Sequence, residues 1–142
     1  KKMLRMHKRR ITMIKSCEQI NFYYCKHCGK IIAMVKDSGT STICCGEAMV
    51  ELKPGTTDGA AEKHVPVVKK MECTAIVSVG SEPHPMTKEH YIEWILLQTS
   101  KGIHTKCLNP GDEPIAEFKL DKDEEIITAY EFCNIHKLWK CC

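Results

Sequence analysis

The stretch EIITAYEFCNIHKLWK, residues 125–140, holds two segments with the composition of β-strands and a short turn between them. β-branched and aromatic residues are frequent in both segments, which is typical of strands. The turn contains Cys133 and His136, and their three-residue spacing lets both side chains reach one metal ion. No neighbouring pair completes a zinc finger around them, so further ligands must come from elsewhere in the chain.

Other segments of the chain have the same strand character. They are CTAIVSVG (73–80), YIEWILLQT (91–99), the start of HTKCLNPGDEP (104–114) and IAEFKL (115–120). Strands at this spacing, with turn residues between them and no long helical period, predict an antiparallel β-sandwich from about residue 62 onward. A helix over residues 89–98 is the alternative, but the many β-branched and aromatic residues there favour a strand.

Composition narrows the class of protein. The 142 residues suffice for one ordinary domain, or for one small and one medium domain, and they include ten cysteines. The first twenty residues contain no apolar signal-peptide core, and no apolar run of 18 residues occurs. We therefore expect a cytoplasmic protein without a membrane partner, whose cysteines bind metals rather than form a disulfide framework.

The positive charge is concentrated at the start of the chain. The net charge is +3, yet residues 1–15 carry seven Lys and Arg and no acidic residue. Such a block could bind nucleic acid, but a solvated tail is the more frequent outcome. We expect residues 1–20 to be a disordered tail and expect no nucleic-acid partner.

A first metal site is indicated by four cysteines within 21 residues. Cys25 and Cys28 stand in CKHC, and Cys44 and Cys45 are adjacent. Four thiolates around a small unit with little apolar content suit iron or zinc. A redox-active disulfide between Cys25 and Cys28 is the competing interpretation. The Gly-, Pro- and Thr-rich segment KPGTTDGAA (53–61) follows and predicts a domain boundary.

Three histidines are candidates for the remaining ligands of Cys133 and His136. His64 lies in EKHVP, His84 in EPHPM and His90 in KEHYIEW. Taken singly, each is more often an ordinary surface or core histidine. Their grouping around turn-rich segments, at one end of the expected sandwich, favours a shared site.

These motifs, taken together and in order, resemble a known family. EKHVP, HPM, EHYIEWI, NPGDEP and CNIHKLWK, preceded by CKHCG and CCGE, are similar to desulfoferrodoxin, the two-iron form of superoxide reductase. The likeness covers residues 21 to 140. It implies a desulforedoxin-like four-cysteine domain over residues 21–57, followed by an immunoglobulin-like β-sandwich over residues 58–142. It also implies a homodimer.

The resemblance further implies a ligand set and an activity. The second iron is expected to have His64, His84, His90 and His136 in a plane and Cys133 on the axis, with Glu62 and Lys63 flanking an open sixth position. The implied reaction is the one-electron reduction of superoxide to hydrogen peroxide without dioxygen release. An external donor such as rubredoxin would then re-reduce the protein.

Several points stay open at this level. The ligands do not decide whether the four-cysteine site holds iron or zinc. Cys17, Cys73, Cys107, Cys141 and Cys142 match no ligand of the family. The alternative functions are a metal-stabilised electron carrier, or a structural module without catalysis.

Overall fold

A computed structural model describes residues 20–142. The basic segment that was expected to be disordered, residues 1–20, lies outside the described residues except for Ile20. Cys17 lies outside them as well. The chain divides into two compact units, the first ending at Glu51 and the second running from Leu52 to Cys142. In the described part, no helix has the length and apolar character that a membrane crossing requires.

The first unit is built from short strands and a tight cysteine turn. β1 (Asn21–Tyr24) lies between β2 (Ile31–Met34) and β5 (Val50–Leu52) in one sheet, and β3 (Ile43–Cys44) pairs with β4 (Glu47–Ala48). β1 and β2 are antiparallel, and the turn between them is closed by a hydrogen bond from Cys25 N to Lys30 O. Among the described residues of this unit, the buried hydrophobic side chains are Phe22, Cys25 and Met49. So small a core needs a further cross-link to be stable.

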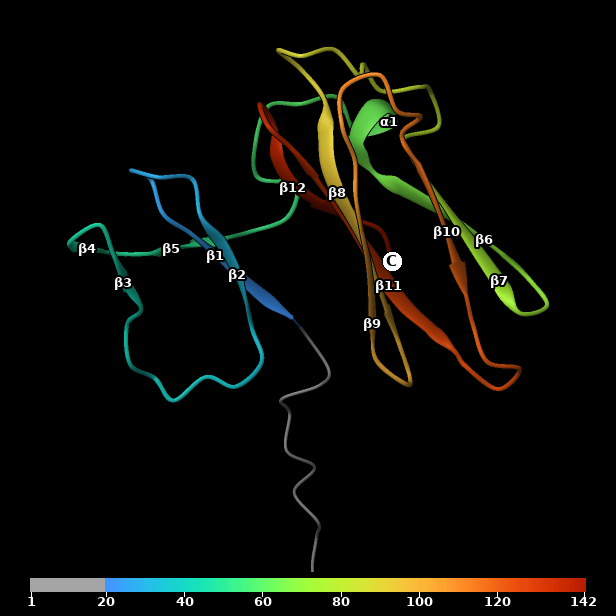
Figure 1. The fold of residues 1–142 in the computed structure, drawn as a ribbon, viewed down its shortest axis with the longest axis horizontal. Helices are drawn as coiled ribbons and strands as arrows, with labels where there is room; N and C mark the ends of the chain where they lie inside the picture. Colours follow the sequence, from blue (N-terminus) through green and yellow to red (C-terminus); the bar gives the residue numbers. More distant parts are fainter. Residues whose placement is uncertain (1–19) are drawn as a thin grey trace, which may run out of the picture. The chain divides into compact units, whose positions relative to one another are not determined.

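The second unit, which is described throughout, consists of two antiparallel sheets (Figure 1). The strand order is β10-β7-β6 in one sheet and β12-β11-β8-β9 in the other. The strands are β6 (Pro66–Met71), β7 (Thr74–Val79), β8 (Ile92–Thr99), β9 (Ile103–Cys107), β10 (Ile115–Lys119), β11 (Ile126–Cys133) and β12 (Lys137–Lys140). The fold is therefore mainly β, as the sequence predicts.

The core lies between these two sheets. Alternate residues of β7, namely Ala75, Val77 and Val79, are buried and the residues between them are partly exposed, because successive side chains of a strand point to opposite faces. β8, in the middle of the other sheet, contributes Ile92, Ile95 and Leu97 to the same cluster. Each fully buried valine, leucine or isoleucine among them stabilises the fold by about 1.5–3 kcal/mol.

The predicted strands from residue 73 onward are confirmed, and the helical alternative for residues 89–98 is wrong, because Ile92–Thr99 pairs with β9 and β11.

One local prediction is also wrong. Residues Ala61–His64 form α1, a single turn of helix, where β structure was expected from about residue 62. Pro66 explains why the helix stops at once, since proline forces the preceding residue into an extended conformation and cannot continue a helix. Val65 has φ −66° and ψ 120°, and β6 follows.

Candidate metal centres

Five side chains from four separate segments converge at one end of the second unit. They are His64 at the end of α1, His84 in the loop after β7, His90 just before β8, Cys133 at the end of β11 and His136 in the turn before β12. One donor atom of each lies within 4.8 Å of the donor atoms of all the others. In Figure 1, α1 and the loop that enters β8 lie at the upper end of the sandwich. The grouping that the sequence favoured is thus present in space.

Backbone carbonyls select the nitrogen that the rings of His64 and His84 turn toward the centre. His64 Nδ1 lies 2.7 Å from Ala60 O, and His84 Nδ1 lies 2.6 Å from Pro85 O. Because a carbonyl only accepts, both Nδ1 atoms carry the proton and both Nε2 atoms present a lone pair. Those two Nε2 atoms face each other at 3.1 Å.

The other two rings also leave a nitrogen facing the centre. His90 Nε2 is buried, and no hydrogen-bond partner for it occurs among the described residues. His136 turns its Nδ1 toward the sulfur of Cys133, at 3.8 Å. A buried nitrogen without a partner is costly unless something else satisfies it, and a metal ion does so.

The spacing of these donors fits a metal. Imidazole nitrogens sit about 2.1 Å from a divalent transition metal, so two donors at right angles lie about 3.0 Å apart. The separation of 3.1 Å between His64 Nε2 and His84 Nε2 agrees with that value. The set of four imidazoles and one thiolate is one that binds transition metals such as iron.

Burial favours the protonation states that imidazole ligands need. Desolvation lowers the pKa of His64, of His90 and of His84, the last to about 4. The three imidazoles are therefore neutral at neutral pH. Burial raises the pKa of the Cys133 thiol, while the backbone N–H groups of His136 and Ile135 act in the opposite direction.

Asn134 ties the two halves of the centre together. Its Oδ1 accepts a hydrogen bond from Tyr91 N at 3.0 Å, and its Nδ2 donates to Glu89 O at 2.9 Å. The side chain thus fastens the segment that carries His90 to the turn that carries Cys133. Sequence reasoning did not single out Asn134, although its place inside CNIH was a signal.

The four cysteines of the first unit also converge. The sulfur atoms of Cys25, Cys28, Cys44 and Cys45 lie within 4.8 Å of one another. Cys28 Sγ is 3.7 Å from Cys44 Sγ, which in turn is 3.9 Å from Cys45 Sγ. Thiolates about 2.3 Å from a tetrahedral ion are separated by about 3.8 Å, so the spacing fits. The adjacent cysteines can converge because Cys45 has a positive φ of 52°.

The electrostatics of this cluster call for a cation. The backbone N–H of Cys28 is the largest of the influences that lower the pKa of Cys25 to about 6, whereas hydrogen bonds with Cys28 and Cys25 raise the pKa of Cys45 to about 12. Four sulfurs this close cannot all ionise without a positive ion among them. His27, inside the CKHC turn, is not one of the grouped residues and pairs with Glu47.

The remaining candidates are placed as follows. Glu62 and Lys63 are exposed on α1, immediately before His64. Desolvation is the largest cause that lowers the pKa of His64 and of His90, and the charge of Lys63 makes a smaller contribution in the same direction. Lys63 therefore acts electrostatically on the centre. Cys73 and Cys107 are exposed, and Cys141 is joined to Cys142 by a disulfide; none of these belongs to either cluster.

Glu131 is a further residue that sequence reasoning missed. It is fully buried two positions before Cys133 in β11, and among the described residues its carboxyl oxygens find no hydrogen-bond partner. Burial raises its pKa to about 9, so the carboxyl is neutral at neutral pH. The period of two along a strand places it on the same face as Cys133, which was the available signal.

Comparison with known proteins gives one consistent family. The family model described as Desulfoferrodoxin matches residues 56–142. A desulfoferrodoxin of Nitratidesulfovibrio vulgaris is 46% identical over 122 residues, which cover 86% of this chain and 95% of that protein. A desulfoferrodoxin homolog of Archaeoglobus fulgidus is 42% identical over 123 residues, covering 87% and 97%. The crystal structure of the superoxide reductase from Treponema pallidum has 39% identity and a TM-score of 0.75, covering 87% of this chain and 99% of that one.

Proposed function

Because this chain belongs to the desulfoferrodoxin family of two-domain superoxide reductases, we propose that it reduces superoxide to hydrogen peroxide at the His4Cys centre. One superoxide, one electron and two protons give one hydrogen peroxide, and no dioxygen is released. The convergence of four imidazoles and one thiolate on a single point carries this proposal.

The residues that would hold the metal of the second site are His64, His84, His90, His136 and Cys133. Iron held there would supply one-electron chemistry, which zinc cannot supply because it does not change its oxidation state. The two Nδ1–H···O=C hydrogen bonds hold the rings of His64 and His84 with Nε2 toward the metal. The thiolate of Cys133 would add electron density to a metal held at this site.

Lys63 and Glu62 are proposed to act at the position that superoxide would occupy beside the metal site. The ammonium group of Lys63 attracts the superoxide anion and can donate a hydrogen bond to it. Its position next to His64 supports this role, as does its effect on the pKa of His64 and His90. The carboxylate of Glu62, on the same exposed turn of helix, is proposed to cover the position after turnover.

The four-cysteine site is proposed to hold iron, with zinc as a structural substitute. Iron there would be a one-electron carrier, and electrons would come from a rubredoxin-like protein. Residues 21–57 and 58–142 are proposed as the two functional domains, in a homodimer. The disulfide between Cys141 and Cys142 lies outside both proposed centres.

The test is rapid mixing of the reduced, iron-counted protein with superoxide, followed by its optical spectrum and by peroxide and dioxygen assays. The wild type is compared with Cys133→Ser and with Cys107→Ser, a control at an exposed cysteine outside both clusters. We expect fast one-electron oxidation and peroxide without dioxygen in the wild type and in Cys107→Ser, and loss of the reaction in Cys133→Ser. An iron-loaded wild type that does not react would overturn the proposal and favour an electron carrier or a structural module.

A further inference from the structure

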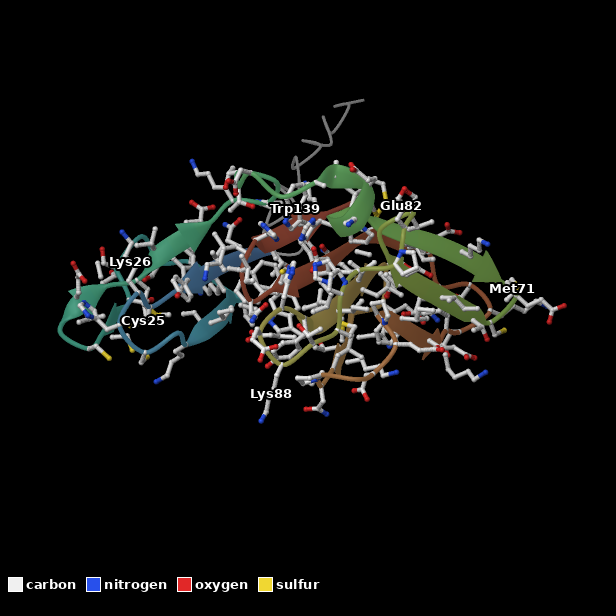
Figure 2. All side chains as sticks on the ribbon, turned by 90° about the horizontal axis from the view of Figure 1, so that it is seen from above. Cys25, Lys26, Met71, Glu82, Lys88 and Trp139 are labelled. Carbon is white, nitrogen blue, oxygen red and sulfur yellow. A yellow bond between two sulfur atoms is a disulfide. The ribbon has the colours of Figure 1, made fainter. Side chains whose placement is uncertain are left out.

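Trp139 contacts two of the grouped histidines at once. This residue of β12 is 6% exposed and is labelled in Figure 2. Its ring lies against the imidazole of His64 with centroids 5.0 Å apart and planes 26° from parallel. Its Nε1–H donates a hydrogen bond of 3.0 Å to the backbone carbonyl of His136.

The same carbonyl has a second donor. Thr57, in the segment before α1, donates from Oγ1 to His136 O at 2.6 Å. A carbonyl oxygen has two lone pairs, so Trp139 and Thr57 together fill its accepting capacity. These two donors, one before and one after His136 in the sequence, hold the backbone of His136 in place. They thereby also fix the point from which its side chain starts.

The indole therefore links two rings that come from separate segments of the chain. The imidazoles of His64 and His136 lie with centroids 4.6 Å apart and planes 77° apart. One belongs to α1 and the other to the turn before β12, so neither main chain sets the position of the other directly. Groups that orient the ligands of a metal affect its affinity by about 10–100-fold when they are removed.

We infer that Trp139 is a positioning residue for the second centre, which fixes His64 through its ring face and His136 through its indole N–H, with Thr57 as the second donor to His136. This inference rests on the proposed metal centre. Trp139 itself supplies no ligand and does not touch the reacting atoms.

Packing alone is the competing explanation, and the chain contains a matched comparison. Its other tryptophan, Trp94, is partly buried in the same unit, and its ring stacks on that of Phe132, with centroids 5.7 Å apart. A packing role predicts similar effects when either tryptophan is changed. A positioning role predicts that only Trp139 and Thr57 affect the metal.

The experiment compares Trp139→Phe, Trp139→Leu and Thr57→Val with the wild type and with Trp94→Phe in the full chain. Trp139→Phe keeps an aromatic face on His64 and loses the N–H donor, whereas Trp139→Leu loses both. Two quantities are measured for the second centre, followed at its own absorption band: removal of iron(II) by a competing chelator, and the reduction potential. Chemical unfolding of the metal-depleted proteins reports on packing separately.

We expect affinity for iron(II) to fall by about 3- to 10-fold in Trp139→Phe and in Thr57→Val, and by about 10- to 100-fold in Trp139→Leu. The potential should shift in all three and stay unchanged in Trp94→Phe. Wild-type affinity and potential in all Trp139 and Thr57 variants would overturn the inference, as would equal losses in Trp94→Phe. Because both quantities are measured without superoxide, failure of the proposed activity would be seen separately.

Discussion

His104 Nε2 lies 2.8 Å from Oε1 of Glu124, a carboxyl that is only 4% exposed. Thr99 Oγ1 donates to the same oxygen, and Asp121 N donates to the other at 2.9 Å. The turn between β8 and β9 and the loop between β10 and β11 lie at the end of the sandwich away from α1 (Figure 1), and the cluster is close to this end. The hydrogen bond with His104 is the first of the causes that lower the pKa of Glu124 from 4.5 to about 2.

This pKa predicts how stability responds to acid. A carboxyl whose pKa is lower in the folded state contributes stability above its unfolded pKa, and the contribution disappears as pH falls through the folded value. The contribution of Glu124 should thus be complete above about pH 5 and be lost between about pH 4.5 and 2. Denaturant unfolding at pH 7 and pH 3 checks this. Glu124→Gln should lose less stability between the two pH values than wild type. Glu125→Gln, at an exposed neighbour, should behave as wild type, and equal acid sensitivity in all three would contradict the prediction.

Lys63→Met should slow the reaction with superoxide about 10-fold or more at low salt without loss of iron. In the wild type, the positive charge of Lys63 next to the centre accelerates the encounter with an anion, and the variant lacks this charge. Stopped-flow rates over a range of ionic strength provide the measurement. The salt dependence should weaken in the variant, because screening acts on the charge that has been removed.

Lys119→Met is the matched control for that charge. Lys119 is exposed on β10 and pairs with Glu117 at 3.5 Å rather than with the centre. Its rate and salt dependence should match the wild type. An equal slowing in both lysine variants would mean that net charge, rather than the place of Lys63, sets the rate.

Cys45→Ser should remove the metal of the first unit and leave the second centre intact. Loss of one thiolate from a four-sulfur site breaks its tetrahedral set, and the two clusters lie in separate compact units. Metal analysis should find about one metal fewer per chain. The absorption band of the second centre and its reaction with superoxide, with a chemical reductant as donor, should persist. Loss of iron from both centres would show that the units depend on each other.

Lys137→Gly should stabilise the protein. Lys137 has a φ of 63°, a left-handed conformation that costs a residue with a Cβ about 1–2 kcal/mol and costs glycine almost nothing. The gain is reduced by the greater entropy of glycine in the unfolded chain, so we expect about 0.5–1 kcal/mol net. Denaturant unfolding of wild type, Lys137→Gly and Lys137→Ala separates the causes. Lys137→Ala keeps the strained backbone and should not gain stability.

Local sequence pattern accounts for much of this molecule. β-branched and aromatic residues predicted β8 correctly against a helical alternative, because pairing on both sides reinforces the same local preference. The clusters around Cys25 and Cys133 were also predictable, since spacing and motif order are read along the chain. What could not be predicted depends on contacts between distant segments. The ring of Trp139 meets His64 only after β12 has docked beside α1, and nothing local to KLWK predicts that contact.

The one turn of helix at Ala61–His64 was missed for a related reason. Four residues are too few to form a helix from propensity alone. Gly80 N donates to Val65 O, and Glu82 N donates to Glu62 O, so the loop after β7 holds the turn in place. The residues of the helix alone therefore do not indicate which distant backbone groups will hydrogen-bond to it.

The positions of the ligands along the chain also determine the order in which the two metal sites become complete during synthesis. All four cysteines of the first cluster lie between residues 25 and 45, whereas the second cluster is incomplete until His136 has been added. During synthesis from the N-terminus, the first site is complete while most of the sandwich has still to be made. The second ion can enter only after residues 64 to 136 have been made and brought together, so its presence reports that the segments from α1 to the turn before β12 have folded.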